Sequence, residues 1–273
     1  MLGVIVGDIT DRFFVELISG VEEEAVKDSM ILIIGNTGES SARQQSQLDM
    51  LLSYSCRDFV IAPVDESPSL IEMLRGEKAN FVIADRIITE AVDFDQVGIN
   101  NRLDSFRAVE YLLERGHRNI MIVNQLSELR TETDRTKGYL EAMRSWGAPV
   151  REEHICQFTS QANIGKLAYD IQRMAHRPTA IYIAKDTLAL ATVSALSAGG
   201  IRVPEDISVI LYGNPDWSQK LTPAFTCMER PVKELGRMAV RIIMQNRSGA
   251  RAVRSERILL DSRLVIQNSV REI

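Results

Sequence analysis

Short, unbroken apolar runs alternate with longer segments of helical period along most of the chain. Unbroken apolar runs predict parallel strands, because a strand covered on both faces needs no polar alternation. Strands alternating with amphipathic helices predict an α/β protein with doubly wound parallel sheets. The expected strands are Leu2–Val6, Met30–Ile34, Phe59–Ala62, Phe81–Ala84, Gln96–Ile99, Ile120–Val123, Ala180–Ile183 and Val209–Leu211, and the expected helices are Phe14–Lys27, Ala42–Tyr54, Phe106–Arg115, Gly138–Trp146, Gly165–Met174 and Leu188–Ala198.

The strands form two successive series, which predicts two wound lobes rather than one continuous sheet. The 273 residues suit two domains of ordinary size. No Gly/Ser- or Pro-rich linker separates the series, so we expect short, ordered connections. Because ligands of open α/β sheets bind beyond the carboxyl ends of the strands, we expect a ligand cleft between the two lobes.

Composition narrows the classes of function. Lys and Arg number 32 against 37 Asp and Glu, a net charge of −5, so the chain lacks the positive surface that DNA binding requires. The three cysteines are far apart, which argues against disulfides and a structural zinc site. There is no signal peptide and no apolar stretch long enough to span a membrane. We expect a cytoplasmic protein without a membrane partner.

Common enzyme signatures are absent from the sequence, including phosphate-binding loops, the GxSxG nucleophile turn and the HExxH helix. The three histidines have no partner at metal-ligand spacing. His117 lies between a helix and a strand, where a cation capping the helix is favoured over a catalytic role. We therefore expect no catalytic activity, no metal and no cofactor.

Five stretches, taken together and in order, resemble the lactose/galactose-repressor (LacI/GalR) family of transcriptional regulators. They are 109–120 (VEYLLERGHRNI), like the family's helix–GHR–strand junction; 135–143 (RTKGYLEAM), like its RxxGYxxAM helix start; 200–209 (GIRVPEDISV), like its GxxVPxDISV strand entry; and 222–226 (TPAFT) and 231–236 (PVKELG), like its TPxLT and PxxELG stretches. One departure is 102–105 (RLDS), where the family often has a Gly-rich helix start.

The resemblance implies an effector-binding core of the periplasmic-binding-protein type, with three chain crossings between the lobes. The expected N-terminal lobe, for dimerisation and the effector cleft, is 1–115 plus 232–261, and the C-terminal lobe is 116–231 plus 262–273. The family's helix-turn-helix headpiece is not in this sequence, so operator DNA is an expected partner only through that missing headpiece.

The resemblance also implies a homodimer, built partly from the helices Phe14–Lys27 and Ser67–Arg75. Leu70, Ile71, Met73 and Leu74 are compatible with an exposed apolar face on these helices, although core packing would explain some of them.

In the first lobe, the resemblance places an aromatic side chain against the effector, with Phe13 favoured over Phe14. Both could instead be core residues, but neighbours on a helix are not expected to face one core. Asp8 would accept hydrogen bonds from effector hydroxyls or cap the helix after Asp11. Arg86 belongs to a DR pair seen in sugar binders of this fold, and a structural salt bridge across the hinge is an equal alternative.

In the second lobe, the resemblance singles out Arg135, whose guanidinium would bind effector oxygens with two hydrogen bonds. A solvated arginine is the alternative, although a helix N-terminus disfavours a cation. Thr131 is a second expected contact, or else a plain loop residue. Phe158 would form an aromatic wall of the cleft, or would pack in the core.

The second lobe departs from the family at the ends of two strands. Lys185-Asp186 replaces the usual Asn-Asp, and Gly213, followed by Asn214, stands where an Asp is typical. The lobe thus loses a carboxylate and gains a cation. With Arg135, Lys185 favours an anionic effector such as a sugar phosphate or sugar acid over a neutral sugar. Lys185 could also extend into solvent.

Two other classes of protein fit part of the pattern. A transport-type solute-binding protein shares the two-lobed fold, but it would be secreted and monomeric. An α/β enzyme is disfavoured because no catalytic set is recognisable. The leading interpretation is the effector-binding and dimerisation domain of a transcriptional regulator.

Overall fold

The computed structural model describes residues 1–65, 67–88, 93–127, 129–249 and 256–273. The chain divides into two compact units. Unit 1 contains Met1–Ile99 and Pro231–Leu260, and unit 2 contains Asn100–Arg230 and Asp261–Ile273. The chain therefore passes between the units three times, after residues 99, 230 and 260.

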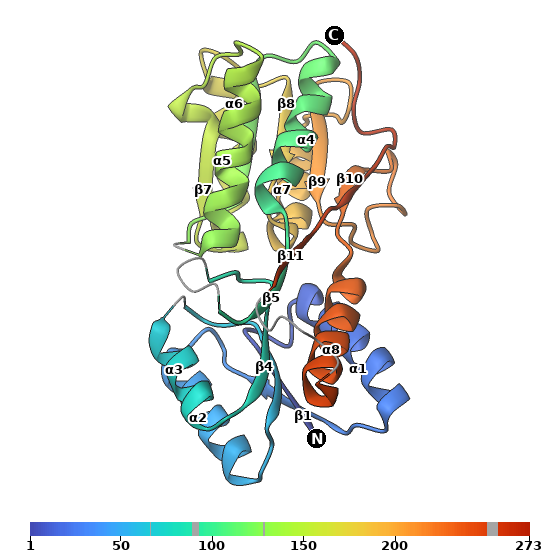
Figure 1. Ribbon diagram of the computed structural model, residues 1–273. Helices are drawn as coiled ribbons and strands as arrows, with labels where there is room; N and C mark the ends of the chain where they lie inside the picture. The colour runs from blue at the N-terminus through green and yellow to red at the C-terminus, as the bar shows by residue number, and fades with distance from the viewer. Residues whose placement is uncertain (66, 89–92, 128, 250–255) are drawn as a thin grey trace. The chain divides into compact units, whose positions relative to one another are not determined.

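Unit 1 is a parallel six-stranded sheet in the order β11-β5-β4-β3-β1-β2. Helices α1 and α8 cover one face and α2 and α3 the other (Figure 1). The strands are β1 (Leu2–Val6), β2 (Leu32–Asn36), β3 (Asp58–Ile61), β4 (Asn80–Ala84), β5 (Asp95–Ile99) and β11 (Arg257–Leu260); the helices are α1 (Arg12–Ala25), α2 (Ser41–Ser53), α3 (Pro68–Gly76) and α8 (Val232–Ser248), with a short 3-10 turn η1 (Val26–Asp28).

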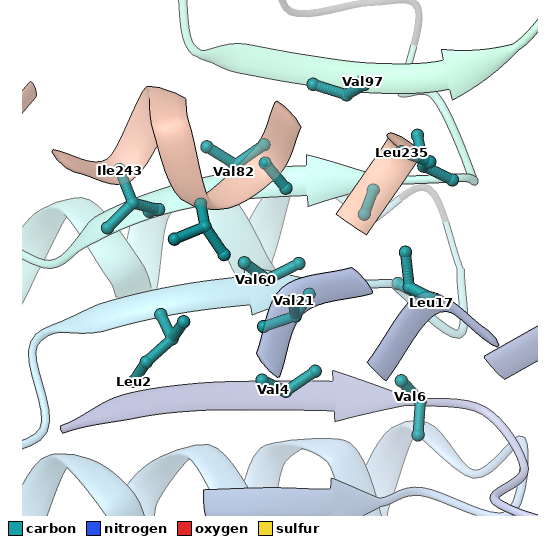
Figure 2. Close-up of a cluster of buried hydrophobic side chains, with 14 of the residues drawn as sticks. Leu2, Val4, Val6, Leu17, Val21, Val60, Val82, Val97, Leu235 and Ile243 are labelled. Atoms are coloured by element: carbon teal, nitrogen blue, oxygen red, sulfur yellow. The ribbon is translucent and has the colours of Figure 1, made fainter. Parts of the chain in front are cut away.

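One hydrophobic core of unit 1 lies between the sheet and helices α1 and α8. Figure 2 shows Val4, Val60 and Val82 from neighbouring strands beside Val21 of α1 and Ile243 of α8. All five side chains are fully buried. Burial of each such side chain contributes about 1.5–3 kcal/mol, so this layer fixes both helices on the sheet.

Unit 2 repeats the same strand order, β12-β10-β9-β8-β6-β7. Its strands are parallel except β12, which pairs antiparallel with β10. One core lies under α4 and α5, and a second lies under α6 and α7. The strands are β6 (Ile120–Gln125), β7 (Ile155–Phe158), β8 (Ala180–Ile183), β9 (Ser208–Tyr212), β10 (Thr226–Glu229) and β12 (Arg263–Val265); the helices are α4 (Asn101–Glu114), α5 (Arg130–Ser145), α6 (Leu167–Arg173) and α7 (Asp186–Ala198), with 3-10 turns η2 (Glu152–His154) and η3 (Gln161–Lys166).

The predicted fold class is confirmed: two parallel-dominated α/β sheets, each with helices on both faces. All eight expected strands are present, within two residues at each end. Four further strands, β7, β10, β11 and β12, and helix α8 were not among the expected elements. Within the described residues, no helix is long and apolar enough to cross a membrane.

The expected boundary of the first lobe at residue 115 is wrong. Helix α4 belongs to unit 2, so the first passage between units follows residue 99. Its buried Ala108, Val109 and Leu112 pack in the same core as Tyr139 of α5 and Tyr182 of β8. This shared core explains why α4 belongs to unit 2 although it directly follows β5.

On helix α3, the core-packing alternative holds, and the apolar residues do not form an exposed face. Leu70, Ile71 and Leu74 are buried, and they pack with the core under α2 and α3. The exposed apolar side chains of unit 1 lie elsewhere, notably Ile31 and Ile34 at the outer strand β2.

His117 is not a cationic helix cap. Its ring lies 2.8 Å from the Thr179 hydroxyl and 3.1 Å from the Arg271 carbonyl, and it is fully buried. Burial lowers the pKa of His117 to about 4, so the ring is neutral at pH 7.

Candidate functional site

Each sheet has a point where its chain connections diverge, between β1 and β3 in unit 1 and between β6 and β8 in unit 2. The carboxyl ends of strands at such a point are where open α/β sheets bind ligands. Most of the residues predicted from the sequence follow these strands. The side chains at these strand ends differ between the units. Those of unit 2 are buried charged groups, whereas those of unit 1 include aromatic rings near one arginine, Arg86.

Arg135 is buried among polar groups of unit 2. Its Nε donates to Asn101 Oδ1 at 2.9 Å, and one terminal nitrogen donates to the Ala184 carbonyl at 3.0 Å and to both oxygens of Glu132. The guanidinium also lies 4.4 Å from the centre of the Tyr212 ring. Arg135 is therefore not the solvated arginine of the alternative interpretation. Burial opposes its charge, but Glu132, Tyr212, Tyr182 and Asp186 together outweigh that effect and raise the pKa of Arg135.

Glu132 is shared by two cations. It lies one helical turn before Arg135, at 3.0 Å, and Lys185 Nζ lies 3.8 Å from its other oxygen. The Glu132 side chain is only 4% exposed and that of Lys185 16%. Lys185 is thus held in this cluster rather than extended into solvent, and its charge is partly compensated by Glu132.

Asp186 begins helix α7 and forms an ion pair with Arg230, which follows β10. Both side chains are at most 10% exposed. Burial alone would raise the pKa of Asp186, but the nearby cations Arg230, Lys185 and Arg135 lower it. The carboxylate therefore stays charged.

A second set of polar groups joins this cluster at the start of α4. The Tyr212 hydroxyl lies 2.9 Å from Asn101 Oδ1 and 3.2 Å from Asp104 Oδ2. Asp104 also accepts hydrogen bonds from the backbone amide and the hydroxyl of Ser262. We call the whole set the charge cluster; its members are Asn101, Asp104, Glu132, Arg135, Lys185, Asp186, Tyr212, Arg230 and Ser262.

The other predicted residues of unit 2 lie at its rim or in its core. Thr131 is buried in the first turn of α5, and within the described residues its hydroxyl has no hydrogen bond. Phe158 is half-buried against the core under α6 and α7, which favours the core interpretation. Asn214 donates to Glu229 at 3.0 Å and accepts from Ser218 and Gln219, so it ties its own loop together.

A pocket of about 380 Å³, lined mainly by polar residues, opens near the end of β6. It is lined by Gln125, Thr159, Ser160, Gln161, Ala162, Thr187 and Leu188. Thr187 directly follows Asp186 of the charge cluster. The pocket offers hydroxyl and amide groups but no charge, and its volume is in the range of small-molecule sites.

In unit 1, Arg86 forms a bidentate ion pair with Glu39, at 2.6 and 2.7 Å, and donates to the Pro63 carbonyl at 2.9 Å. Arg86 therefore forms a salt bridge, but within unit 1 and not across the hinge as the alternative expected. The Arg86 guanidinium also lies 5.8 Å from the Phe14 ring. Gly7 leaves the space for this arrangement, because a Cβ there would lie 2.1 Å from Glu39 Oε1.

Phe13 and Phe14 both pack in the core of unit 1, contrary to the expectation that only one could do so. Their rings meet edge to face at 5.3 Å. This is possible because α1 begins just beyond the carboxyl end of β1, where both rings contact the same apolar layer. Asp11 caps α1 through the amide of Phe13, whereas Asp8 accepts hydrogen bonds from Thr10. An effector contact from any of these residues remains a prediction.

Six members of the charge cluster were not predicted from the sequence: Asn101, Asp104, Glu132, Tyr212, Arg230 and Ser262. One signal was available: Glu132 and Arg135 are three residues apart, a spacing that brings side chains together on a helix. The other partners are far apart in sequence and could not be paired without the fold. Among the described residues, no group of three His, Cys, Asp or Glu side chains is placed to hold a metal ion.

Comparisons with known proteins match nearly the whole chain. A family model described as a periplasmic binding protein-like domain matches residues 109–270. The HTH-type transcriptional repressor CytR of Escherichia coli is 29% identical, over 98% of this chain and 78% of that repressor. The HTH-type transcriptional repressor PurR of Vibrio atlanticus is 31% identical, over 89% and 73%. A regulatory protein of LacI family from Chloroflexus aggregans has the same fold, with a TM-score of 0.87 at 24% identity over 99% and 98%.

Proposed function

The chain belongs to the LacI family of transcriptional regulators, and we propose that the charge cluster of unit 2 binds the effector that controls its regulation. The named relatives are repressors, which supports a regulator over a transport-type solute-binding protein. We place its action in the cytoplasm, at operator DNA bound through a helix-turn-helix segment of the kind named in those repressors.

The observation that carries this proposal is the balance of charge in the cluster. Within the cluster, three cations, Arg135, Lys185 and Arg230, face two directly paired carboxylates, Glu132 and Asp186. The third carboxylate, Asp104, binds Tyr212 and Ser262. The cations thus outnumber the carboxylates paired with them, and an anionic group on a ligand would compensate the difference. The effector class that fits is a sugar phosphate or sugar acid, with its hydroxyls in the polar pocket beside Thr187.

Regulation then follows from differential binding. A ligand shifts a conformational equilibrium only by the difference in its affinity for the two states. The charge cluster provides such a difference in affinity, because an anion binds most tightly to the state in which Arg135 and Lys185 lie close together.

We also propose that the regulator is a homodimer paired through the outer strand β2. Ile31 and Ile34 are 71% and 48% exposed at this edge. An outer strand with exposed apolar side chains readily pairs with another chain. Sedimentation should show a dimer that Ile34→Lys weakens; a monomer at micromolar concentration would refute this part.

A thermal-shift screen tests the effector class. Ribose, ribose 5-phosphate, gluconate and 6-phosphogluconate should be compared at equal concentration. A ligand at 100 times its Kd adds about 2.7 kcal/mol of stability and so raises the Tm. Arg135→Lys should abolish the shift, whereas Arg144→Lys in the last turn of the same helix should not. Tighter binding of ribose than of every anion would refute the anionic class.

A further inference from the structure

Each of the three passages between the units is followed or preceded, within two residues, by a member of the charge cluster. Asn101 follows the first passage, Arg230 ends unit 2 at the second, and Ser262 follows the third. All three side chains bind partners inside unit 2. This coincidence concerns positions that are 129 and 32 residues apart in sequence, so local sequence does not explain it.

Asn101 and Arg230 contact the proposed ligand-binding side chains directly. Ser262 is connected to them through a chain of hydrogen bonds, which we call the relay. Asn101 accepts from Arg135 Nε at 2.9 Å. Arg230 is paired with Asp186. Ser262 binds Asp104, which lies 3.2 Å from the Tyr212 hydroxyl, and that hydroxyl lies 2.9 Å from the Asn101 oxygen that Arg135 also uses.

The Tyr212 hydroxyl is the point where these contacts depend on one another. Burial raises the pKa of Tyr212 well above its ordinary value, so the hydroxyl keeps its proton. One proton faces two acceptors, Asn101 Oδ1 and Asp104 Oδ2. A change in the hydrogen bond from Arg135 to Asn101 therefore changes the hydrogen bond that Tyr212 donates to Asp104. It thereby also changes the hydrogen bonds between Asp104 and Ser262.

We propose that Asn101, Arg230 and the Tyr212–Asp104–Ser262 relay are positioning residues that couple the effector site to all three connections. They do not themselves need to touch the ligand. Any displacement of one unit against the other must pass through these connections, so anchoring them to Arg135 and Asp186 makes the ligand-binding groups and the connections one cooperative set. The inference rests on the proposed function only for the role of Arg135 as a ligand contact.

Amide hydrogen exchange of the ligand-free chain tests the relay. Tyr212→Phe removes the hydroxyl and keeps the ring beside Arg135. We expect exchange in residues 100–104 and 260–264 to accelerate about fivefold, the effect of losing one buried hydrogen bond. The matched control is Tyr139→Phe, which removes another buried hydroxyl of unit 2, bonded to the Ile120 carbonyl at 2.8 Å. It should leave both segments unchanged. Equal rates in Tyr212→Phe and the unmodified chain, or an equal effect of the control, overturn the relay.

A double-mutant cycle then tests the coupling to Arg135. Arg135→Lys keeps the charge beside Glu132 but loses the Nε bond to Asn101. We expect it to accelerate exchange at 260–264, which Arg135 does not touch, and to add nothing in the Tyr212→Phe background. No effect at 260–264, or a full effect on top of Tyr212→Phe, overturns the proposal. The exchange experiment uses no ligand, so it can be interpreted even if no effector is found in the thermal-shift screen. Likewise, a negative result in the double-mutant cycle does not contradict the proposed effector site.

Discussion

A close contact between helices α4 and α5 of unit 2 gives a quantitative test of how the charge cluster is built. Gly138 of α5 faces α4, and a Cβ at this position would lie 2.1 Å from the Arg102 carbonyl oxygen and 2.9 Å from Ser105 Cβ. A carbonyl inside a helix cannot rotate away. Gly138→Ala therefore forces α4 and α5 apart by about 1 Å, since carbon atoms pack at 3.5–4.0 Å.

The magnitude follows from three contributions. Overpacking a close contact costs about 1–3 kcal/mol. Alanine recovers up to about 1 kcal/mol of helix propensity relative to glycine. Separating the helices also stretches the 2.9 Å bond from Arg135 on α5 to Asn101 on α4, at a cost of about 1 kcal/mol. We expect a net loss of about 2 kcal/mol in the free energy of unfolding of unit 2.

Tryptophan fluorescence during urea unfolding measures this loss selectively. Both tryptophans, Trp146 and Trp217, lie in unit 2. The control is Gly165→Ala in the same unit, where an added Cβ has no neighbour within 4 Å. That control should be neutral or slightly stabilising. If Gly138→Ala unfolds at the same urea concentration as the control, the close packing of α4 on α5 does not hold the cluster in place.

Two further predictions concern buried ionisable groups. Glu132→Gln leaves Arg135 and Lys185 without their shared carboxylate, and removing one partner of a buried ion pair costs about 3 kcal/mol or more of stability. The control Glu141→Gln, in an exposed pair with Arg102, should change the stability little. Equal urea midpoints for the two variants would contradict this reasoning. His117 stays neutral in the folded chain while its unfolded form binds a proton below about pH 6.5. Stability should therefore fall by about 1.4 kcal/mol per unit as the pH drops from 6.5 towards 4, a loss of roughly 3 kcal/mol, and His117→Gln should flatten this slope. An unchanged slope in that variant would show that other groups cause it.

The fold could be predicted because parallel strands buried on both faces appear as apolar runs. β1 and β8 match their expected ranges without any difference. The missed strands lack that pattern: β11 and β12 each begin with an exposed arginine, Arg257 and Arg263, and β12 has three residues. Outer strands need apolar side chains on fewer positions, so their composition does not separate them from loops.

Helix starts in unit 2 were predicted too late, for a different physical reason. Helix α5 was expected from Gly138 and begins at Arg130; α4 was expected from Phe106 and begins at Asn101. The missed turns contain 130–137 (RTETDRTK) and 101–105 (NRLDS). They hold hydrophobic residues at few or no positions, yet Thr131, Glu132 and Arg135 are buried there. For Glu132 and Arg135, hydrogen bonds rather than apolar contacts compensate the burial.

These two polar turns also hold four of the nine members of the charge cluster, Asn101, Asp104, Glu132 and Arg135. A site for a polar small molecule needs buried polar groups, and hydrophobic periodicity, which counts only apolar positions, must fail wherever such groups are gathered. The failure is informative when it falls just after a predicted parallel strand. In this chain, Glu132 and Arg135 follow β6 at helical spacing and bind one another at 3.0 Å. A charged pair three residues apart, in a polar stretch between a buried strand and an amphipathic helix, indicates a helix start rather than a loop, at the strand end where open α/β sheets bind ligands.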